Sequence, residues 1–339
     1  MIDNIIEKLT QHQSLTISES NNCMNQILLG NVANEQLVTF LTTLAEKKEV
    51  ASELVGFLQA MMHHSKKIDC GNNTIDICGT GGSSKERFNV STCVAFALAA
   101  AGVKVAKHGN YGSKKPNGSF NFLEELELPF NAEISIIETL FNQTQVCFLF
   151  ARAFHPAMRH VAAARKQLGR RTVFNLLGPL ANPAHVDYQL IGLPNNDSES
   201  LLIDVIQQLS RKKVLLVIGG DGRDEISLSG DSQIIEITNK SVNKHIFNFQ
   251  KEIESCDDQY ECGSSQENAQ IFKSICAKNQ WDHPIIKHIA INAAAGLYVM
   301  DKAPTLQEGY KTVMNLFKQG LVTDKISQYR QIASSLIQN

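Results

Sequence analysis

The chain has 339 residues, of which 43% are hydrophobic and 19% are charged. These fractions are typical of globular proteins, so they exclude wholesale disorder and supply enough apolar material for one large or two unequal domains. Lys and Arg number 32 against 34 Asp and Glu, a formal net charge of −2 with His neutral. This balance argues against a protein that binds polyanions through bulk charge, and it leaves room only for a local basic patch.

The cysteines and the apolar runs bear on where the protein works. Eight cysteines are scattered along the chain without a Cys-x-x-Cys pair, which is typical of free thiols in a reducing compartment. The best candidate for a membrane span, residues 94–103, is too short to cross a bilayer. The first ten residues lack the basic-then-apolar order of a secretory signal. We therefore expect a soluble cytoplasmic protein with no membrane partner.

The N-terminal part of the chain has the apolar spacing of amphipathic helices. Apolar residues recur three and four positions apart, as in the run from Leu54 to Met61. The segment 65–73 breaks this pattern with glycine and asparagine, which is typical of a linker. We therefore expect a helical domain over residues 1–70 and a second domain over residues 71–339.

Beyond this linker, short apolar runs alternate with longer helical ones. The short runs predict buried strands, and the amphipathic or alanine-rich runs between them predict helices. The strands are expected at 74–78, 103–106, 146–150, 188–193, 214–219 and 234–238, and the helices at 88–101, 134–141, 157–168, 198–209, 289–300 and 305–317. This alternation predicts an α/β fold with a mainly parallel central sheet that helices cover on both faces.

A glycine-rich turn follows the first predicted strand. Residues 79–83 read GTGGS, and FNVST at 88–92 opens the next helix. Glycines let backbone N–H groups approach an anion closely, and a helix start adds unpaired donors with a positive dipole end. The glycine spacing matches neither the dinucleotide fingerprint nor the P-loop. A phosphate cradle and a tight turn, with Ser91 and Thr92 as ordinary capping residues, explain this motif equally well.

A cationic loop follows the second predicted strand. Residues 107–119 contain three lysines, three glycines and two serines. Because the loop lies at the carboxyl end of a strand, where open α/β sheets bind ligands, it suits a phosphate-bearing substrate. The pair Lys114 and Lys115 is also typical of a solvated loop tip. An isolated histidine such as His108 is more often structural than catalytic.

An acidic pair follows a later strand, in the sequence GGDGRDEIS at residues 219–227. Asp224 and Glu225 offer hard oxygen ligands that suit Mg²⁺ bridged to a substrate phosphate, although an acidic β-turn explains the motif as well. In the arginine-rich run 165–171, most cations are typical of a helix surface, but one turned inward could bind a carboxylate through two hydrogen bonds. Together, the motifs at the strand ends fit a diphosphate bound through magnesium.

With these motifs in this order, the sequence resembles the anthranilate phosphoribosyltransferase family, whose fold is of the nucleoside phosphorylase type. The resemblance covers most of the chain and is carried by GTGG at 79–82, FNVST at 88–92, VKVAKHGN at 103–110, RKQLGRRTVFNLLGPLANP at 165–183 and GGDGRDEIS at 219–227. It implies a small helical domain, joined in space by part of residues 165–185 and hinged to a larger α/β domain. It also implies that 5-phosphoribosyl 1-diphosphate donates its phosphoribosyl group to the amine of anthranilate, in tryptophan biosynthesis. A homodimer formed through the helical domain is expected on the same basis.

The resemblance further implies roles for individual residues. The expected donor-binding residues are Gly79, Gly82, Ser83, Asn89, Ser91, Thr92, Lys107 and Ser119. Anthranilate would contact Gly79, Asn110 and Arg165, with Arg165 placed for its carboxylate. Two Mg²⁺ ions per subunit are expected, held by Ser91, Asp224 and Glu225. No catalytic residue is predicted firmly, and His108 is a candidate proton relay.

The sequence departs from the family pattern inside these motifs. Ser83 stands where the family has Asp, Arg87 where it has a small residue, and residues 111–117 replace an Arg- and Ser-rich run. Another aromatic acceptor therefore remains open, as does a non-catalytic nucleic-acid-binding paralogue. A pyrimidine nucleoside phosphorylase is disfavoured by the acidic pair, and nucleic acid is disfavoured by the slightly negative net charge.

Overall fold

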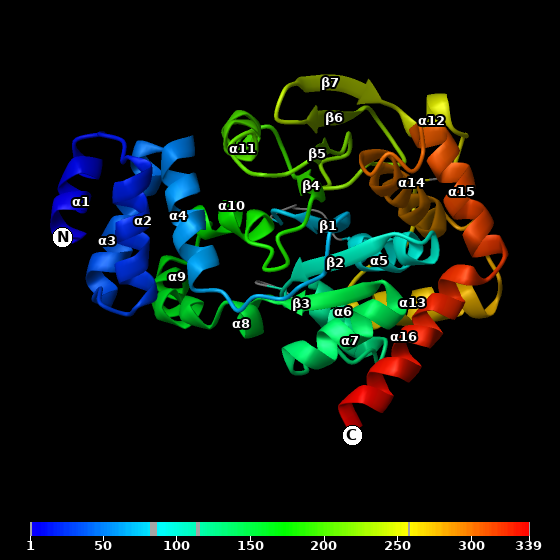
Figure 1. Ribbon diagram of the computed structural model, residues 1–339. Helices are drawn as coiled ribbons and strands as arrows, with labels where there is room; N and C mark the ends of the chain where they lie inside the picture. Colours follow the sequence, from blue (N-terminus) through cyan, green and yellow to red (C-terminus); the bar gives the residue numbers. More distant parts are fainter. Residues whose placement is uncertain (1, 82–86, 113–115, 257, 339) are drawn as a thin grey trace.

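The computed structural model describes residues 2–81, 87–112, 116–256 and 258–338. Gly82 and Ser83 of the expected donor site, and Lys114 and Lys115 of the cationic loop, lie outside these residues. A bundle of N-terminal helices stands beside a larger unit in which helices enclose a sheet (Figure 1). No helix in the described part of the chain is both long and apolar enough to span a membrane.

The N-terminal bundle forms as the apolar spacing predicts. Its helices are α1 (Ile2–Thr10), α2 (Ile17–Leu28), α3 (Asn34–Lys47) and α4 (Ala51–His63). α2 begins at a capping box, in which Thr16 and Glu19 each accept a hydrogen bond from the other's backbone N–H. The apolar faces of the four helices meet in one core, where Phe40 and Phe57 are fully buried in edge-to-face contact.

The larger unit is built on a sheet whose seven strands all lie in the described residues. They are β1 (Thr74–Gly79), β2 (Lys104–Gly109), β3 (Val146–Phe150), β4 (Tyr188–Leu193), β5 (Lys213–Ile218), β6 (Ser232–Ile237) and β7 (Val242–Phe247). Their order is β3-β2-β1-β4-β5-β6-β7. The strands from β3 to β5 in this order are parallel, whereas β6 and β7 are antiparallel to their neighbours. The prediction of a mainly parallel sheet is confirmed.

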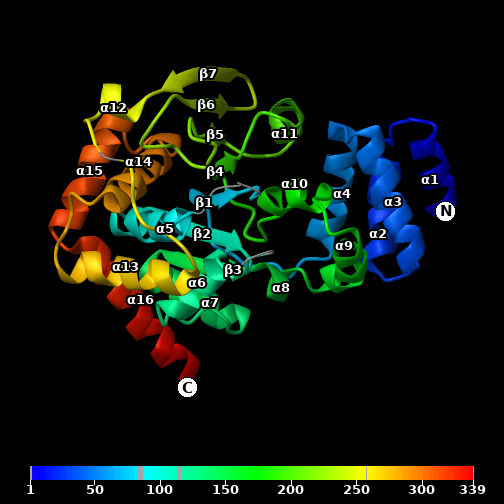
Figure 2. The same cartoon turned by 180° about the vertical axis from the view of Figure 1, so that it is seen from behind.

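Helices cover both faces of the sheet, as predicted (Figures 1 and 2). Leu215 and Val217 of β5 pack with α5 (Val90–Ala100) and α14 (Pro284–Val299), while Val214 and Leu216 point to the opposite face. That opposite face is covered by α4 and α11 (Glu199–Ile206), and near β3 by α7 (Ile134–Thr144). Apart from the helices between β3 and β4, the other helices of the described residues are α6 (Ser119–Glu125), α12 (Phe249–Glu252), α13 (Ser265–Ala277), α15 (Leu306–Lys318) and α16 (Leu321–Gln338).

The segment between β3 and β4 packs against the N-terminal bundle. It contains α8 (Ala151–Phe154), a 3₁₀-helix (Pro156–Val161), α9 (Ala162–Leu168) and α10 (Val173–Leu180). Val161, Ala164, Phe174 and Leu177 are buried in the same apolar core as the bundle helices. Residues from the middle of the chain therefore complete the packing of the N-terminal helices.

Several short helices were not predicted, and two further differences from the sequence prediction have a clear physical cause. The single helix expected over 157–168 is wrong: the chain forms the 3₁₀-helix and then α9. Pro156 fixes the first turn, and Val161, with ψ near −6°, marks the change of helix type between the two. β7 was not predicted because residues 243–246 are exposed and carry no apolar alternation.

Candidate functional site

The glycine turn, the cationic loop and the acidic pair all follow the carboxyl ends of parallel strands. β1, β2 and β5 end at Gly79, Gly109 and Ile218, and the strand registers bring these ends to one edge of the sheet. The strand order changes direction between β1 and β4. Open α/β sheets bind ligands at such a switch point, so the functional site is expected at this edge.

Two glycines make room for Asp224 at the edge of the sheet. Gly79 ends β1, and Gly192 is its partner on β4. A Cβ atom on Gly79 would lie 2.2 Å from Asp224 Oδ2, and one on Gly192 would lie 1.7 Å from the Asp224 carbonyl oxygen. Both distances are far shorter than van der Waals contact, so a larger residue would displace the loop that carries Asp224. The first glycine of the GTGG motif thus has a steric function as well as any function in phosphate binding.

Asp224 forms an ion pair with Arg87. Arg87 Nη1 lies 2.9 Å from Asp224 Oδ1 and 3.0 Å from Oδ2, so one nitrogen contacts both carboxylate oxygens. The Asp224 side chain is 4% exposed, whereas that of Arg87 is 35% exposed. The Asp224 carboxylate raises the pKa of the Arg87 guanidinium. Sequence reasoning noted Arg87 only as a departure from the family and missed this contact.

Glu225 lies against a second group of polar side chains. Its Oε2 atom is 3.6 Å from Nε2 of the fully buried His288, and neither atom has a hydrogen-bond partner within the described residues. His288 Nδ1 is hydrogen bonded to Tyr260 Oη at 2.7 Å. Burial and the charge of Asp224 raise the pKa of Glu225 to about 8, and burial lowers the pKa of His288 to about 4. At pH 7 both side chains are therefore mostly neutral.

The start of α5 and Lys107 border the glycine turn. Ser91 is half-buried, and Thr92 Oγ1 is buried with no hydrogen-bond partner in the described part of the chain. Lys107 is 1% exposed, and its Nζ donates to the Ile77 carbonyl at 2.6 Å. Burial lowers the pKa of Lys107, and the nearby Asp76 opposes this shift. Lys107 therefore lies beneath the turn and supports β1, instead of extending into the open loop.

Asparagine side chains join the cationic loop to α5 and α13. Asn268 Nδ2 donates to Asn89 Oδ1 at 3.0 Å and to the Arg87 carbonyl at 3.1 Å. Asn117 Nδ2 donates to the same carbonyl at 3.0 Å. Ser119 begins α6, beside the end of β2. The predicted residues Asn89 and Ser119 thus come to the same edge, and the connecting residues Asn117 and Asn268 had no sequence signal.

The two residues expected to contact the acceptor lie on different elements. Asn110 is exposed after β2, and its Oδ1 accepts from the Tyr111 backbone N–H at 2.8 Å. Arg165 on α9 is half-buried, with its guanidinium carbon 5.4 Å from the centre of the Phe174 ring. No hydrogen bond or ion pair between described residues joins Asn110 to Arg165, and none pairs Arg165 with a carboxylate there. The Arg165 guanidinium is therefore available to an anionic ligand.

Arg171 contacts the glycine turn, although it was not among the predicted site residues. Its guanidinium donates to the carbonyl of Gly81 and, at 3.2 Å, to that of Thr80. The run 165–171 contains three arginines, and Gly169, at φ +60°, ends α9 and redirects the chain between them. Since the direction of each arginine depends on this turn, the run alone could not identify Arg171.

His108 lies below the edge of the sheet in a neutral form. Its side chain is 6% exposed, and its ring centre is 5.3 Å from that of His155. Burial, with a smaller effect of His155, lowers the pKa of His108 to about 3. Its backbone N–H donates to the buried Asp76 carboxylate at 3.0 Å. The imidazole therefore carries no positive charge at neutral pH.

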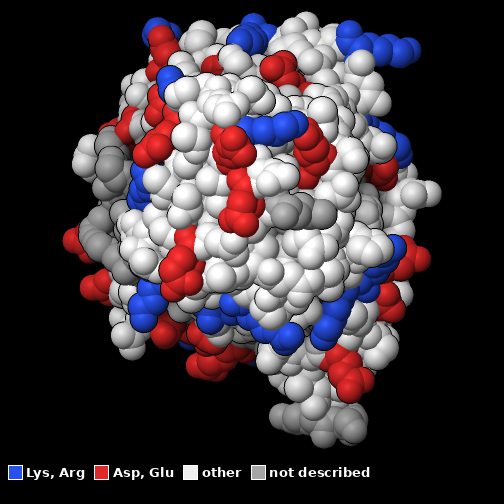
Figure 3. Space-filling view, turned by 90° about the vertical axis from the view of Figure 1, so that its left-hand side faces the viewer, with Lys and Arg blue, Asp and Glu red and all other residues white. Residues whose placement is uncertain are grey.

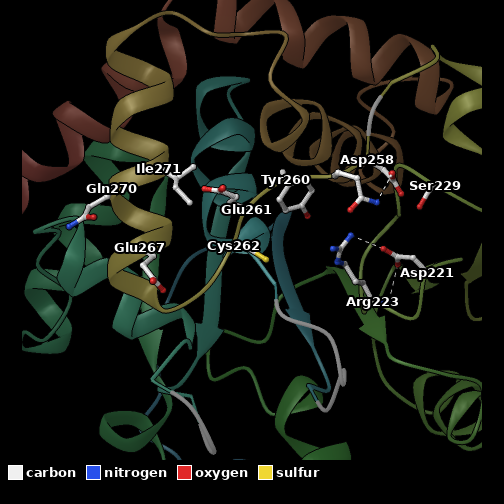
Figure 4. Close-up of a pocket in the computed structure, with 11 residues that line it drawn as sticks. Asp221, Arg223, Ser229, Asp258, Tyr260, Glu261, Cys262, Glu267, Gln270 and Ile271 are labelled. Carbon is white, nitrogen blue, oxygen red and sulfur yellow. Dashed lines mark hydrogen bonds and ion pairs between the residues drawn. The ribbon is translucent and has the colours of Figure 1, made fainter.

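An open cavity of about 760 Å³ adjoins the acidic loop (Figure 4). Arg223 pairs with Asp221, their closest atoms being 2.6 Å apart, and its guanidinium lies 5.2 Å from the centre of the Tyr260 ring. The other residues that line the cavity are Ser229, Asp258, Gln259, Glu261, Cys262, Glu267, Gln270 and Ile271. Because carboxylates outnumber cations here, this cavity is less suited to a diphosphate than the glycine turn is.

The residues present fit a divalent cation that takes part of its coordination from a substrate. Within the described residues, no group of three or more His, Cys, Asp or Glu side chains could enclose an ion. Asp224, Glu225 and the Ser91 hydroxyl nevertheless offer oxygen ligands, and Glu225 Oε2 is a buried acceptor without a partner in that part of the chain. Mg²⁺ commonly binds through one or two carboxylates together with substrate phosphates.

Comparison with known proteins defines the class. Residues 3–65 match the helical bundle domain of a glycosyl transferase family, and residues 71–323 match the α/β domain. The anthranilate phosphoribosyltransferase of Dehalococcoides mccartyi is 36% identical over 340 aligned positions, which cover 99% of each protein. The chain therefore belongs to the glycosyl transferase family that contains the anthranilate phosphoribosyltransferases, as the motifs indicated.

Solved structures give the same result for the fold. The crystal structure of anthranilate phosphoribosyltransferase from Thermus thermophilus matches with a TM-score of 0.88 at 29% identity, over 97% of this chain and 99% of that one. The enzyme from Saccharomyces cerevisiae in complex with PRPP and Mg matches with a TM-score of 0.87 at 24% identity, over 98% of each chain. The predicted architecture, a helical N-terminal part and a larger α/β part, is confirmed.

Proposed function

We propose that this protein transfers the phosphoribosyl group of 5-phosphoribosyl 1-diphosphate to the amine of anthranilate, in tryptophan biosynthesis. The products are N-(5-phosphoribosyl)anthranilate and diphosphate. The observation that carries the proposal is the convergence of Asp224, Glu225 and the start of α5 at the end of β1. The relative from Dehalococcoides mccartyi, which bears the name of this activity, aligns over almost the whole chain.

The donor diphosphate would bind between the glycine turn and the start of α5. The N-terminus of this 11-residue helix offers unpaired N–H groups and a positive dipole end. Thr92 Oγ1 is a buried hydroxyl without a partner among the described residues, and Ser91 lies half-buried beside it. Lys107, whose Nζ donates to the Ile77 carbonyl, would add positive potential to the donor site. Gly82 and Ser83 are included in the proposed donor site because the sequence around them resembles the anthranilate phosphoribosyltransferase family.

Magnesium would be held by Asp224, Glu225 and Ser91. Bound there, Mg²⁺ would neutralise negative charge that accumulates on the departing diphosphate. Metal binding requires Glu225 to lose its proton, so affinity should rise with pH toward the raised pKa of about 8. We propose two ions per subunit, and a calorimetric titration with donor present would count them.

At the sugar, the main contribution of this chain would be to position the two reactants and to stabilise the charge on the leaving group. The bond between ribose C1 and the diphosphate oxygen breaks, the anthranilate nitrogen bonds to C1 with inversion, and the nitrogen then loses a proton. Backbone N–H groups of the glycine turn would stabilise the charge on the leaving group. The pKa of His108 is about 3, so this candidate relay would be a weak base at pH 7. Holding amine and C1 in line therefore supplies most of the proposed rate enhancement.

Anthranilate would be oriented through its carboxylate. Arg165 has no carboxylate partner among the described residues, and stacking on Phe174 holds its guanidinium. A guanidinium can donate two parallel hydrogen bonds to a carboxylate, which favours an aromatic acid over an aromatic amine without one. Asn110, exposed at the end of β2, would contact the other side of the acceptor.

The nucleic-acid alternative has less support. Acidic and basic side chains lie beside one another on the face formed by the N-terminal helices, with large uncharged areas between them (Figure 3). The formal net charge of −2 also gives the protein no overall positive field that would attract phosphodiesters. Binding to DNA that weakens steeply with added salt would revive this alternative.

The deciding experiment follows anthranilate fluorescence with purified protein, 5-phosphoribosyl 1-diphosphate and Mg²⁺. Loss of signal that needs all three components is the expected result. No loss of signal, with donor binding still detected by calorimetry, would instead indicate a different aromatic acceptor. Absence of both turnover and donor binding would contradict the proposed activity.

The assembly and location of the protein belong to the same proposal. We expect a homodimer through the N-terminal helices, where the apolar Ile17 and Leu29 are 36% and 54% exposed. Multi-angle light scattering measures this directly, and a charged substitution of Leu29 should shift the mass toward the monomer. A cytoplasmic location agrees with the eight cysteines, which are scattered along the chain without a Cys-x-x-Cys pair.

A further inference from the structure

We propose that Arg87 is a resident counter-cation of the acidic pair, which a divalent metal ion must displace from Asp224 before the metal–diphosphate donor is fully bound. The inference rests on the proposed metal site at Asp224 and Glu225. It gives a function to a side chain that stands out in the sequence only as a departure from the family pattern. Arg87 would thereby set the metal affinity of this protein.

Within the described residues, the Asp224 carboxylate is closely covered, with only 4% of the side chain exposed. One nitrogen of Arg87 contacts both oxygens, at 2.9 and 3.0 Å. Gly79 packs so closely against Oδ2 that even a Cβ atom would not fit between them. Gly192 confines the backbone of Asp224 in the same way. A metal ion that binds both Asp224 oxygens would therefore compete with the Arg87 guanidinium, which now contacts both of them.

Arg87 can leave Asp224 without leaving the site. Asn117 and Asn268 both donate hydrogen bonds to its backbone carbonyl, so its main chain is fixed. Its side chain is 35% exposed, in contrast to the 4% exposure of its partner. A guanidinium released from this fixed point stays within reach of an incoming diphosphate, and arginine binds phosphate oxygens through paired hydrogen bonds.

The charges of Arg87 and Asp224 predict how removing Arg87 would change the metal affinity. In the free protein Arg87 neutralises a carboxylate that is almost completely buried, and a metal ion would do the same. Without Arg87, the buried carboxylate loses the counter-charge that contacts it directly, so a metal ion should bind more tightly. The hydrogen bonds that the metal must break are charge-assisted, so the gain should be about tenfold or more.

The test measures Mn²⁺ binding to the full chain by electron paramagnetic resonance, with no substrate present. Arg87→Met removes the charge and keeps much of the side-chain length, and Arg87→Lys keeps the charge. Lys213→Met is the matched control, because it also removes a cation from an ion pair with an aspartate, Asp301. Lys213 begins β5, whereas Asp224 follows the other end of that strand. Arg87→Met should bind Mn²⁺ about tenfold more tightly than the wild type. Lys213→Met should bind Mn²⁺ as the wild type does. The affinity of Arg87→Lys should lie between those of the wild type and Arg87→Met.

Asp224→Asn separates this inference from the proposed metal site. If Asp224→Asn loses Mn²⁺ while Arg87→Met binds it no more tightly than the wild type, the metal site stands and the inference about Arg87 is overturned. If no variant binds Mn²⁺, even with inorganic diphosphate present, the metal site fails and the inference fails with it. Metal-free calorimetry with inorganic diphosphate adds a second readout, in which Arg87→Met should bind several-fold more weakly than the wild type.

Discussion

Two buried glutamates, one in each part of the molecule, differ in the hydrogen bonds and ion pairs that their carboxylates form. Glu53 in the N-terminal bundle accepts hydrogen bonds from the backbone N–H groups of Leu15 and Val50, at 2.9 and 3.0 Å. Its Oε1 also lies 3.0 Å from Nζ of Lys47, whose side chain is 3% exposed. Glu225 at the edge of the sheet has a buried Oε2 with no hydrogen-bond partner in the described residues.

The difference separates a carboxylate that stabilises the fold from one that is available to a ligand. Burying a charge is costly unless hydrogen bonds and a counter-charge compensate for it. Glu53 has that compensation and connects the start of α2, the end of α3 and the start of α4. Glu225 is instead held in its neutral form by burial, and a cation would restore its charge.

The largest effect should come from neutralising the acidic pair. Asp224→Asn combined with Glu225→Gln should reduce magnesium-dependent turnover by about 10³-fold or more, because the charge on the leaving diphosphate loses its metal counter-ion. Anthranilate fluorescence measures the turnover, and circular dichroism checks that the fold is retained. Full activity in this folded double variant would sink the metal assignment.

Replacing Glu53 should affect stability instead. Glu53→Ala should lower the free energy of unfolding by about 3–5 kcal/mol, because Lys47 would be left buried without a counter-charge. Urea denaturation measures this. Glu225→Gln, the matched change in the other part of the molecule, should cost less than about 1 kcal/mol at pH 7. If Glu225→Gln lost much of the free energy of unfolding and Glu53→Ala lost little, the comparison would be reversed.

A smaller effect is expected for the acceptor. Arg165→Ala should raise the KM for anthranilate about tenfold, since a charge-assisted pair with the carboxylate is lost. The KM for 5-phosphoribosyl 1-diphosphate should change much less, and initial-rate kinetics with each substrate varied in turn distinguish the two. Equal increases in both constants would mean that Arg165 supports the packing around Phe174 rather than the acceptor.

The smallest predicted effect is on the pH dependence of stability. Burial raises the pKa of Glu225 to about 8, so between about pH 5 and 8 the folded protein keeps a proton that the unfolded chain has lost. The free energy of unfolding should therefore fall as pH rises through this range, and Glu225 should contribute about 1 kcal/mol or more to that fall. Glu225→Gln cannot titrate and should show a flatter profile by urea denaturation. Parallel profiles for the two proteins would contradict the assignment.

The strands and helices that could be predicted from the sequence are those that the local spacing of apolar residues determines. The strands of the parallel part are continuous apolar runs because both of their faces are covered, and this signal is visible without the fold. The acidic pair was found for a similar reason, since a glycine turn at a strand end is a local feature. The family was found through five motifs in order, and the relatives confirm it.

What the sequence could not predict depends on contacts between distant segments. Arg87 and Asp224 are 137 positions apart, and nothing local to either residue indicates the other. Tyr260 and His288 meet only because the segment before α13 crosses α14. Lys107 was expected in an open loop because lysine is rarely buried, yet the Ile77 carbonyl and Asp76 compensate its charge below the turn.

The hydrogen bonds of Asn268 also bear on the order of folding. They reach Arg87, Asn89 and Asn117 across 181, 179 and 151 positions of the chain. Closing such long loops is entropically costly before other contacts repay it, so these bonds should form after the central strands have paired. The edge proposed to bind the donor would then be among the last parts of the protein to become ordered. A nascent chain would gain its activity only once residues near 268 have been synthesised and packed.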